Sequence, residues 1–154
     1  MTREIIGFAM VSAVLLIALL VGIGYRNKRL RESLQIAPPI EAVDCNGASC
    51  LYVSTVFSES PLKRMLAHGM GPRGRAMVSI TSEGVSVCRK GERGFLIPKS
   101  AVVGVEKSTA TIDRAVEPGG LTSVAWNHDG QMLVTNLRFE SRQEREMFEK
   151  EVAA

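Results

Sequence analysis

The sequence predicts a mainly β domain, a seven-stranded sandwich or barrel capped by a C-terminal α-helix, held on an N-terminal transmembrane helix. Three observations predict it. A run of twenty residues without a charge opens the chain, from Ile5 to Gly24. Seven short apolar runs then recur between turn residues at a spacing of about 8–12 residues, which is typical of a small all-β fold. The last segment, from Ser141, changes to the period of an α-helix.

The composition supports one ordered domain and excludes several classes of protein. The chain has 154 residues, enough for one domain of ordinary size, and its 45% apolar content is too high for intrinsic disorder. The whole net charge of +3 belongs to residues 1–32, because the rest of the chain carries equal numbers of cations and anions. The pI of about 8.9 therefore reflects the N-terminal segment and does not indicate a nucleic-acid-binding protein.

The uncharged run predicts a transmembrane anchor over residues 1–25. Twenty helical residues at about 1.5 Å each span about 30 Å, the thickness of a bilayer's hydrocarbon core. A buried core helix is disfavoured, because the run is apolar on every face. A cleaved signal peptide stays open as an alternative, although the cations that follow the run favour a stop at the membrane surface. These cations are Arg26, Lys28, Arg29 and Arg31.

The same four cations predict the orientation of the chain. Only Arg3 and the amino terminus precede the span, so the positive-inside rule places the N-terminus outside the cell membrane and the C-terminal domain in the cytoplasm. Tyr25 stands where an interfacial aromatic residue is expected. The cations either attract anionic lipid headgroups or only fix the topology, and both interpretations stay open.

Residues 26–47 are predicted to form a juxtamembrane helix and a linker, followed by the domain at residues 48–154. Residues 26–35 lack glycine and proline, so the membrane helix continues beyond the bilayer. Pro38 and Pro39 end it, because neither donates a backbone hydrogen bond and the first restricts the residue before it.

The strands of the domain are predicted from apolar residues that alternate between turn residues. The pair Asp129-Gly130 is a strong signal for a hairpin between the last two strands. The fifth run is long enough for one bent strand, or for a helical turn followed by a strand. The seven runs are residues 50–57, 75–81, 85–89, 95–97, 101–111, 121–126 and 132–139.

The last segment predicts one amphipathic helix over residues 141–152. Ser141 with Glu144 three residues later matches a capping box. Phe148 and Val152, four residues apart, give a narrow apolar stripe. One helix after seven strands has an open end of the sandwich to cover, and we expect Phe148 to be the main side chain that it inserts.

No residue pattern predicts catalysis, a metal site or a cofactor. His128 lies in the expected hairpin turn, and His68 precedes a glycine-rich loop without an acidic neighbour. That loop, residues 69–75, lacks the strand–loop–helix context and the terminal Lys-Ser/Thr of a phosphate-binding loop. The protein is therefore predicted not to be an enzyme and to need no cofactor.

The three cysteines agree with a cytoplasmic domain, because secreted scaffolds of this size usually carry an even number. Together with His68 they have no recognised zinc-site spacing. If the domain lies outside the cell instead, Cys45 and Cys50 are the natural disulfide pair, since a plausible turn separates them. Whether these two cysteines ever pair stays open at this point.

The middle of the domain carries a second concentration of positive charge. Residues 63–99 hold eight cations against Glu83 and Glu92. If the central strands and loops share a side, these cations form a face that suits a phosphorylated lipid headgroup. Scattered, solvated charge is the alternative. The candidate anionic-ligand face comprises Lys63, Arg64, Arg73, Arg75, Arg89, Lys90 and Arg93.

Seven strands followed by a capping helix is the arrangement of pleckstrin-homology (PH) domains. The segments HGMGPRGRA (68–76), FLIPKSAVVGV (95–105) and GGLTSVAW (119–126) resemble actinobacterial single-pass membrane proteins with a cytoplasmic PH-like domain. Together with the span and the hairpin, the resemblance covers most of the chain. It implies a fold and an anchored arrangement, and no catalytic residue, because PH-like domains are generally binding modules.

These observations predict a non-enzymatic binding or scaffold module at the cytoplasmic face of the membrane, with a protein as its ligand. Exposed sheet edges are available for the addition of a peptide strand. One alternative is recognition of anionic lipid through the basic face, and another is a role as accessory subunit of a membrane transport or export assembly. The expected partners are the bilayer and a protein, either a soluble one or another membrane subunit, with anionic lipid as the alternative ligand and no nucleic acid.

Overall fold

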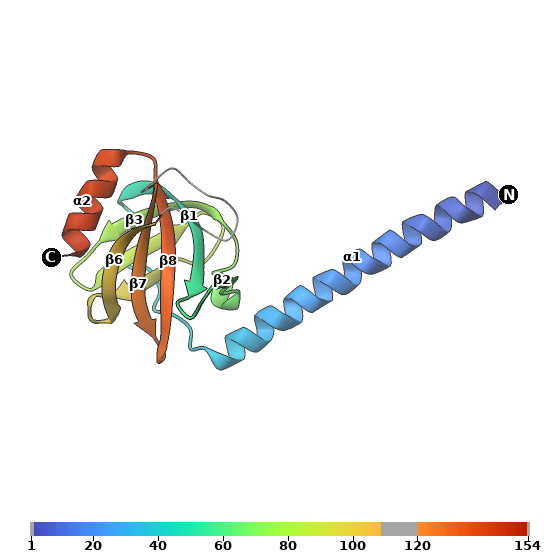
Figure 1. Ribbon diagram of the computed structural model, residues 1–154, viewed down its shortest axis with the longest axis horizontal. Helices are drawn as coiled ribbons and strands as arrows, with labels where there is room; N and C mark the ends of the chain where they lie inside the picture. The colour runs from blue at the N-terminus through green and yellow to red at the C-terminus, as the bar shows by residue number, and fades with distance from the viewer. Residues whose placement is uncertain (1, 109–119, 154) are drawn as a thin grey trace.

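The structure is a computed structural model that describes residues 2–108 and 120–153. Helix α1, Thr2–Gln35, extends away from a β domain (Figure 1). Within the described residues it is the one helix long and apolar enough to cross a membrane, with a mean hydropathy of 2.8 over its most apolar stretch. Its apolar side chains face outward, and Phe8 is 78% exposed. Such a surface suits lipid and is unfavourable in water, and the helix ends before Pro38, as predicted.

One antiparallel sheet of eight strands makes up the domain. Its main path runs β5-β4-β3-β1-β8-β7-β6, and β2 pairs with β1 off this path. The first strand β1 and the last strand β8 therefore lie side by side in the middle of the sheet, and β5 and β6 are its edges. The bounds are β1 Ala48–Phe57, β2 Ser60–Arg64, β3 Gly74–Ile80, β4 Gly84–Arg89, β5 Phe95–Pro98, β6 Val102–Ser108, β7 Leu121–His128 and β8 Gln131–Phe139.

All seven predicted strands are present, and the prediction missed β2. Four of the five residues of β2 are exposed, so its sequence shows no alternation of apolar and polar residues. The predicted run 101–111 is a short turn, η2 at Lys99–Ala101, followed by β6. Residues 109–111 of that run lie outside the described residues.

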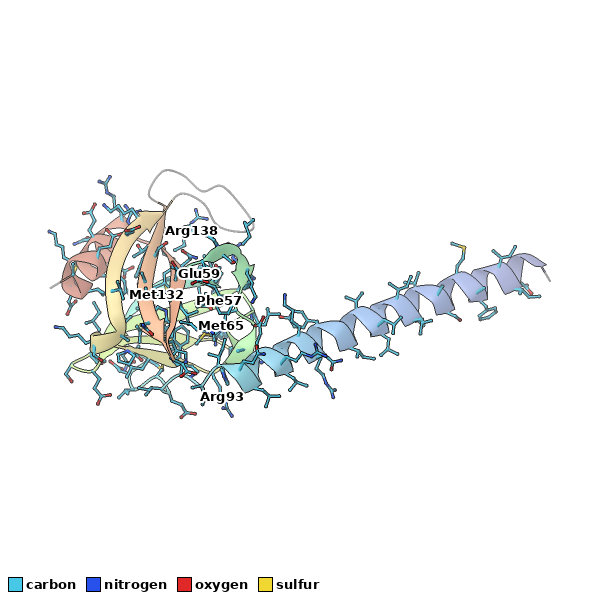
Figure 2. All side chains as sticks on the ribbon, turned by 60° about the horizontal axis from the view of Figure 1, so that its bottom comes forward. Phe57, Glu59, Met65, Arg93, Met132 and Arg138 are labelled. Carbon is cyan, nitrogen blue, oxygen red and sulfur yellow. A yellow bond between two sulfur atoms is a disulfide. The ribbon has the colours of Figure 1, made fainter. Side chains whose placement is uncertain are left out.

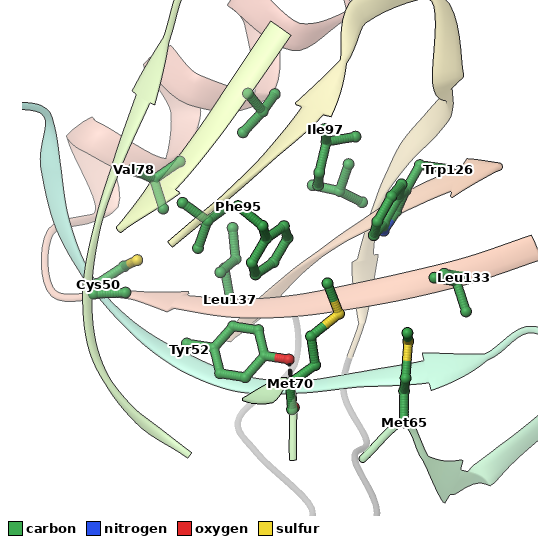
Figure 3. Close-up of a cluster of buried hydrophobic side chains, with 14 of the residues drawn as sticks. Cys50, Tyr52, Met65, Met70, Val78, Phe95, Ile97, Trp126, Leu133 and Leu137 are labelled. Carbon is green, nitrogen blue, oxygen red and sulfur yellow. Dashed lines mark hydrogen bonds between the residues drawn. The ribbon is translucent and has the colours of Figure 1, made fainter. Parts of the chain in front are cut away.

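The core lies between the curled halves of the sheet and is built on three aromatic residues (Figure 3). The Phe95 ring stacks on Trp126 and meets the edge of Tyr52, with 6.1 Å between ring centroids in both pairs. Polar atoms on these side chains are satisfied inside the core, as buried groups require. The Tyr52 hydroxyl donates to the Met70 carbonyl oxygen at 2.7 Å, and Trp126 Nε1 donates to Thr135 Oγ1 at 3.0 Å.

The hairpin between β7 and β8 forms at the predicted turn. Asp129 and Gly130 both have positive φ, 51° and 75°. A two-residue turn of type I′ requires positive φ at both positions, and aspartate and glycine tolerate it best.

Helix α2, Arg142–Val152, covers the domain at the end where β6 and β8 lie (Figure 1). Phe148 is buried, and its ring centroid is 5.0 Å from that of Phe139, so its predicted role in the core is confirmed. The predicted capping box is wrong. Ser141 is the N-cap residue, with an extended backbone, but its side chain makes no cap hydrogen bond.

Residues 36–47 lie against the domain. The Leu96 N–H of β5 donates to the Ile40 carbonyl oxygen at 2.8 Å, so the linker covers part of the β5 edge. The Ala37 N–H donates to the Asp129 carboxylate at 3.2 Å. Further along, Cys45 forms a disulfide with Cys88 of β4.

The pairing of Cys45 with Cys50, which the sequence leaves open, is not the one that forms. Cys50 is a free, buried thiol on the core side of β1, whereas Cys88 lies on β4 beneath the passing linker. The sequence separation of 43 residues between Cys45 and Cys88 gives no local signal for the pair.

Candidate functional site

The end of α1 is docked on the loop between β2 and β3. The Leu66 N–H donates to Glu32 Oε2 at 2.7 Å, and Glu32 is 8% exposed. His68 Nε2 donates to the Ile36 carbonyl oxygen at 2.7 Å. Two turns nearer the N-terminus, the Tyr25 hydroxyl lies so close to Gly71 that a Cβ there would be 3.0 Å from it. The loop therefore lies along α1 from the end of the helix back to Tyr25, which follows the apolar run.

A groove of about 390 Å³ lies beside the edge strand β6. One wall is β6 itself, where Val103 is 65% exposed. The opposite walls are the β3–β4 turn and the end of α2, which contributes Val152. Within the described residues β6 pairs only with β7, so its outer backbone groups face this side.

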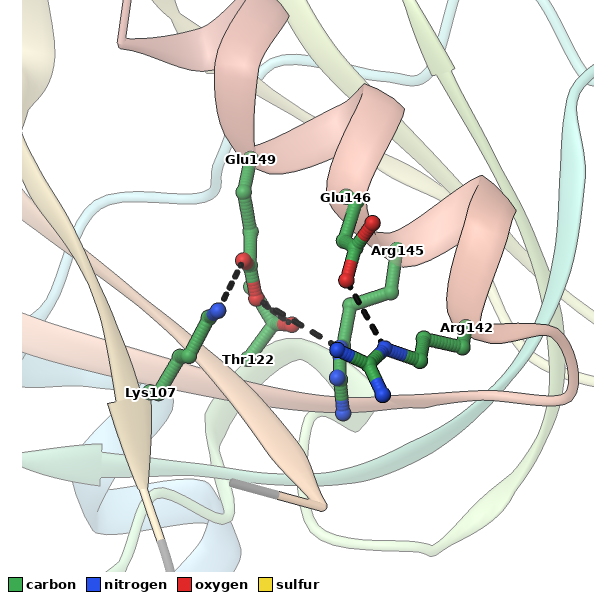
Figure 4. Close-up of polar contacts among 6 residues, drawn as sticks. All are labelled: Lys107, Thr122, Arg142, Arg145, Glu146 and Glu149. Carbon is green, nitrogen blue, oxygen red and sulfur yellow. Dashed lines mark hydrogen bonds and ion pairs between the residues drawn. The ribbon is translucent and has the colours of Figure 1, made fainter.

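Glu149 fixes the distance between α2 and the sheet (Figure 4). Its carboxylate accepts a hydrogen bond from Thr122 Oγ1 of β7 at 2.9 Å and pairs with Lys107 Nζ of β6 at 3.5 Å. Arg145 Nε lies 3.8 Å from the same carboxylate. Three groups from three elements thus meet on one side chain, which holds the helix beside β6 and keeps one wall of the groove in place.

Arg89, one of the seven cations of the predicted basic face, points into the protein. Its guanidinium donates to the carbonyl oxygens of Gly69 and Arg93, both at 2.7 Å, and lies 4.8 Å from the centroid of the Tyr52 ring. Burial lowers the pKa of Arg89, against the opposite effect of Tyr52 and Glu92. A sequence signal for this exists, because Arg89 continues the inward face of β4 set by Val85 and Val87.

The other cations of the predicted face lie in different places. Arg64 donates to the Gly71 carbonyl oxygen at 3.1 Å, and the Lys63 ammonium lies over the Phe57 ring at 4.7 Å. Arg75 and Lys90 line a groove beside the disulfide. Arg93 lines a different hollow with Arg29, at the junction of α1 and the domain (Figure 2). Arg73 is exposed on the loop before β3.

No arrangement for acid–base or nucleophilic chemistry is present among the described residues. His68 and His128 each donate to a linker carbonyl oxygen, of Ile36 and Ala37 respectively. Burial raises the pKa of the Cys50 thiol to about 12, so it is a weak nucleophile at neutral pH. In the same part of the chain, no three histidine, cysteine, aspartate or glutamate side chains are placed to hold a metal ion.

Two features escaped sequence reasoning because they depend on distant contacts. In the sequence, Glu32 is one of several charged residues on a helix expected to be exposed. Only the fold brings the Leu66 N–H within hydrogen-bond distance of it. The β6 groove depends on where the end of α2 lies relative to the β3–β4 turn.

The architecture and the comparisons with known proteins agree. An antiparallel sheet with a C-terminal helix over its end is the arrangement expected of a PH-like domain. A comparison with curated proteins finds no match to this sequence. Residues 33–153, most of the chain, match the family described as bacterial PH domain-like, and the protein belongs to that family.

Proposed function

We propose that the protein is a membrane-anchored, non-enzymatic binding module that takes up an extended segment of a protein partner along β6. PH-like domains are generally non-catalytic binding modules, and α1 supplies a candidate anchor. The observation that carries the proposal is the outer side of β6, which has no partner strand among residues 2–108 and 120–153, next to a groove lined by valines. Main-chain hydrogen bonds to such an edge supply affinity, and a groove for alternate side chains supplies specificity.

The two edges of the sheet differ in a way that favours β6. The linker occupies the β5 edge through the hydrogen bond between Leu96 and Ile40. The β6 groove offers the side chains of Val102, Val105 and Val152 to an incoming apolar residue. Lys99 and Glu151 stand at its rim, where they could pair with charges that flank the bound segment.

Site-specific photocrosslinking in cells tests this proposal. A photoreactive residue at Val103 of the full-length protein should give a discrete adduct with one protein. The matched control is Val43 on the linker, because these two valines are 65% and 63% exposed. The same residue at position 43 should give no such adduct, and Val103→Glu should weaken binding of the identified partner at least tenfold, whereas Val43→Glu should not. Adducts equal at both positions, or at neither, would contradict the proposal.

The identity of the crosslinked partner distinguishes two roles. A soluble or peripheral protein supports a scaffold. An integral membrane protein supports an accessory subunit of a transport or export assembly, because one helix cannot enclose a solute pathway. Recognition of anionic lipid is a second candidate function and rests on a different surface, described below.

We also propose that the domain faces the cytoplasm, on the strength of the four cations that follow the span. The Cys45–Cys88 disulfide favours the opposite side, because disulfides persist in oxidising compartments. We base the proposal on the cations and not on the disulfide, since positive charge beside a span acts directly on how the chain inserts into the membrane. Protease added to intact cells should leave the domain uncleaved. Cys45 and Cys88, if alkylated directly in growing cells, should be found as free thiols. Cleavage of the domain together with an intact disulfide would reverse the orientation.

A further inference from the structure

A polar hollow of about 560 Å³ lies where α1 meets the domain. Arg29 of α1 lines one side, His68 and Gly69 line the loop side, and the turn between β4 and β5 closes it with residues 91–93. We propose that this hollow binds the phosphate group of an anionic phospholipid in the bilayer that α1 spans. The proposal rests on the membrane anchoring proposed above and does not require a protein partner on β6.

The hollow lies at the outer edge of the lipid headgroup layer. The apolar span ends at Gly24, and Arg29 lies five residues further along the helix, about 7–8 Å at the helical rise. The headgroup layer on each side of a bilayer is about 5–7 Å thick. Because Tyr25 contacts Gly71 and Arg29 lies next to Gly69, the wall supplied by the domain is at this same depth.

The charges around Gly69 leave a positive surplus. A Cβ on Gly69 would lie 2.9 Å from Glu92 Oε2, 3.6 Å from Arg29 Nη2 and 3.7 Å from Arg89 Nη2, so these three groups converge there. Arg93 lines the hollow as well. Three cations therefore face one carboxylate. The phosphate diester of a phospholipid, with its one negative charge, would reduce the surplus, whereas a cationic ligand would add to the repulsion.

Arg89 organises this hollow from beneath. By donating to the carbonyl oxygens of Gly69 and Arg93, its buried guanidinium ties together the two segments that form the walls. Arg29 and Arg93 are then the two cations on the walls themselves. Arg29 precedes the residues that match the family, 33–153, so the site is made jointly by the anchor and the domain.

The test measures retention of one lipid by the full-length protein. The protein is reconstituted into nanodiscs of phosphatidylcholine with a minor fraction of phosphatidylglycerol, released, and examined by native mass spectrometry. The double variant Arg29→Gln/Arg93→Gln should retain phosphatidylglycerol at least about tenfold less well, because it removes both cations that line the hollow and could hydrogen-bond the phosphate. The matched control is Lys28→Gln/Arg31→Gln, which removes two exposed charges from the same helix without changing the lining. It should change retention less than about twofold.

Two further measurements separate a site from general attraction and from soluble phosphate. Glu92→Gln, which removes the one carboxylate of the hollow, should increase retention. Excess inorganic phosphate should displace little of the retained lipid from detergent-solubilised protein. Equal losses in both double variants, reduced retention in Glu92→Gln, or full displacement by phosphate would each overturn the proposal. These outcomes are independent of crosslinking at Val103, so the two proposals fail separately.

Discussion

The Glu32 carboxylate accepts a hydrogen bond of 2.7 Å from the Leu66 backbone N–H, and so joins the end of the membrane helix to the domain. Glu32 is 8% exposed, and Leu66 is also buried. The His68 contact with Ile36 adds a second tie within the next turn. The domain is therefore held on the end of α1 by these two contacts, one from each end of the residues 66–68.

Glu32→Ala should destabilise the domain by about 1.5–3 kcal/mol, because it leaves the Leu66 N–H buried without its charged acceptor. Urea unfolding of the full-length protein in detergent, followed by the fluorescence of Trp126, measures this change. The control is Glu41→Ala on the exposed linker, which should alter stability by less than about 0.5 kcal/mol. Equal effects of the two substitutions would show that the buried contact contributes nothing.

Reduction of the Cys45–Cys88 disulfide should lower the free energy of unfolding by about 2–4 kcal/mol. The bond closes a long loop, with a sequence separation of 43 residues, and so restricts the unfolded chain. Urea unfolding with and without a reductant measures the difference. The variant Cys45→Ser/Cys88→Ser should be as stable as the reduced protein and insensitive to the reductant. A wild-type protein that ignores the reductant would contradict the pairing.

Stability should fall as the pH rises above about 9, because two buried acids resist ionisation in the folded state. Burial raises the pKa of Cys50 from 9.0 to about 12 and the pKa of Tyr52 from 10.0 to about 12. The unfolded chain therefore loses these protons first. The stabilisation is complete below pH 9 and is lost between about pH 9 and 12, at up to about 1.4 kcal/mol per pH unit for each group.

Urea unfolding from pH 8 to pH 11 follows this loss, and Cys50→Ala separates the two groups. In that variant the decline should begin near pH 10, where only Tyr52 still contributes. A wild-type stability that stays flat to pH 11, or a variant that declines as early as the wild type, would contradict the assignment.

Phe148→Ala should cost about 3–5 kcal/mol, because it leaves a cavity against Phe139 at the end of the domain. The neighbouring Met147→Ala is the control, since Met147 is 61% exposed and should cost less than about 0.5 kcal/mol. The two unfolding midpoints in urea give the comparison. Similar midpoints would show that α2 does not seal the core.

The sequence carried enough information for most strands and for the covering helix, because their side chains alternate with the period of each element. In β4, the alternation that puts Val85 and Val87 on the inner face also directs Arg89 inward. The period of the strand therefore predicts that Arg89 does not belong to an exposed basic face.

The remaining features depend on contacts between distant segments. The strand β2 shows no alternation because four of its five residues are exposed. The partner of Cys45 follows from the path of the linker over β4, and the hollow at Arg29 follows from the docking of Glu32. The disulfide and the Glu32 contact have no local pattern, since they join residues 43 and 34 positions apart.

Extraction of membranes with alkaline carbonate tests most directly whether α1 anchors the domain in a bilayer. The full-length protein should stay in the membrane pellet, because about twenty apolar residues in the hydrocarbon core hold it there. A variant with Leu15→Lys and Leu19→Lys, each costing about 2.5–3.5 kcal/mol at the centre of a span, should move to the soluble fraction. Release of the unmodified protein into the supernatant would contradict the anchored arrangement.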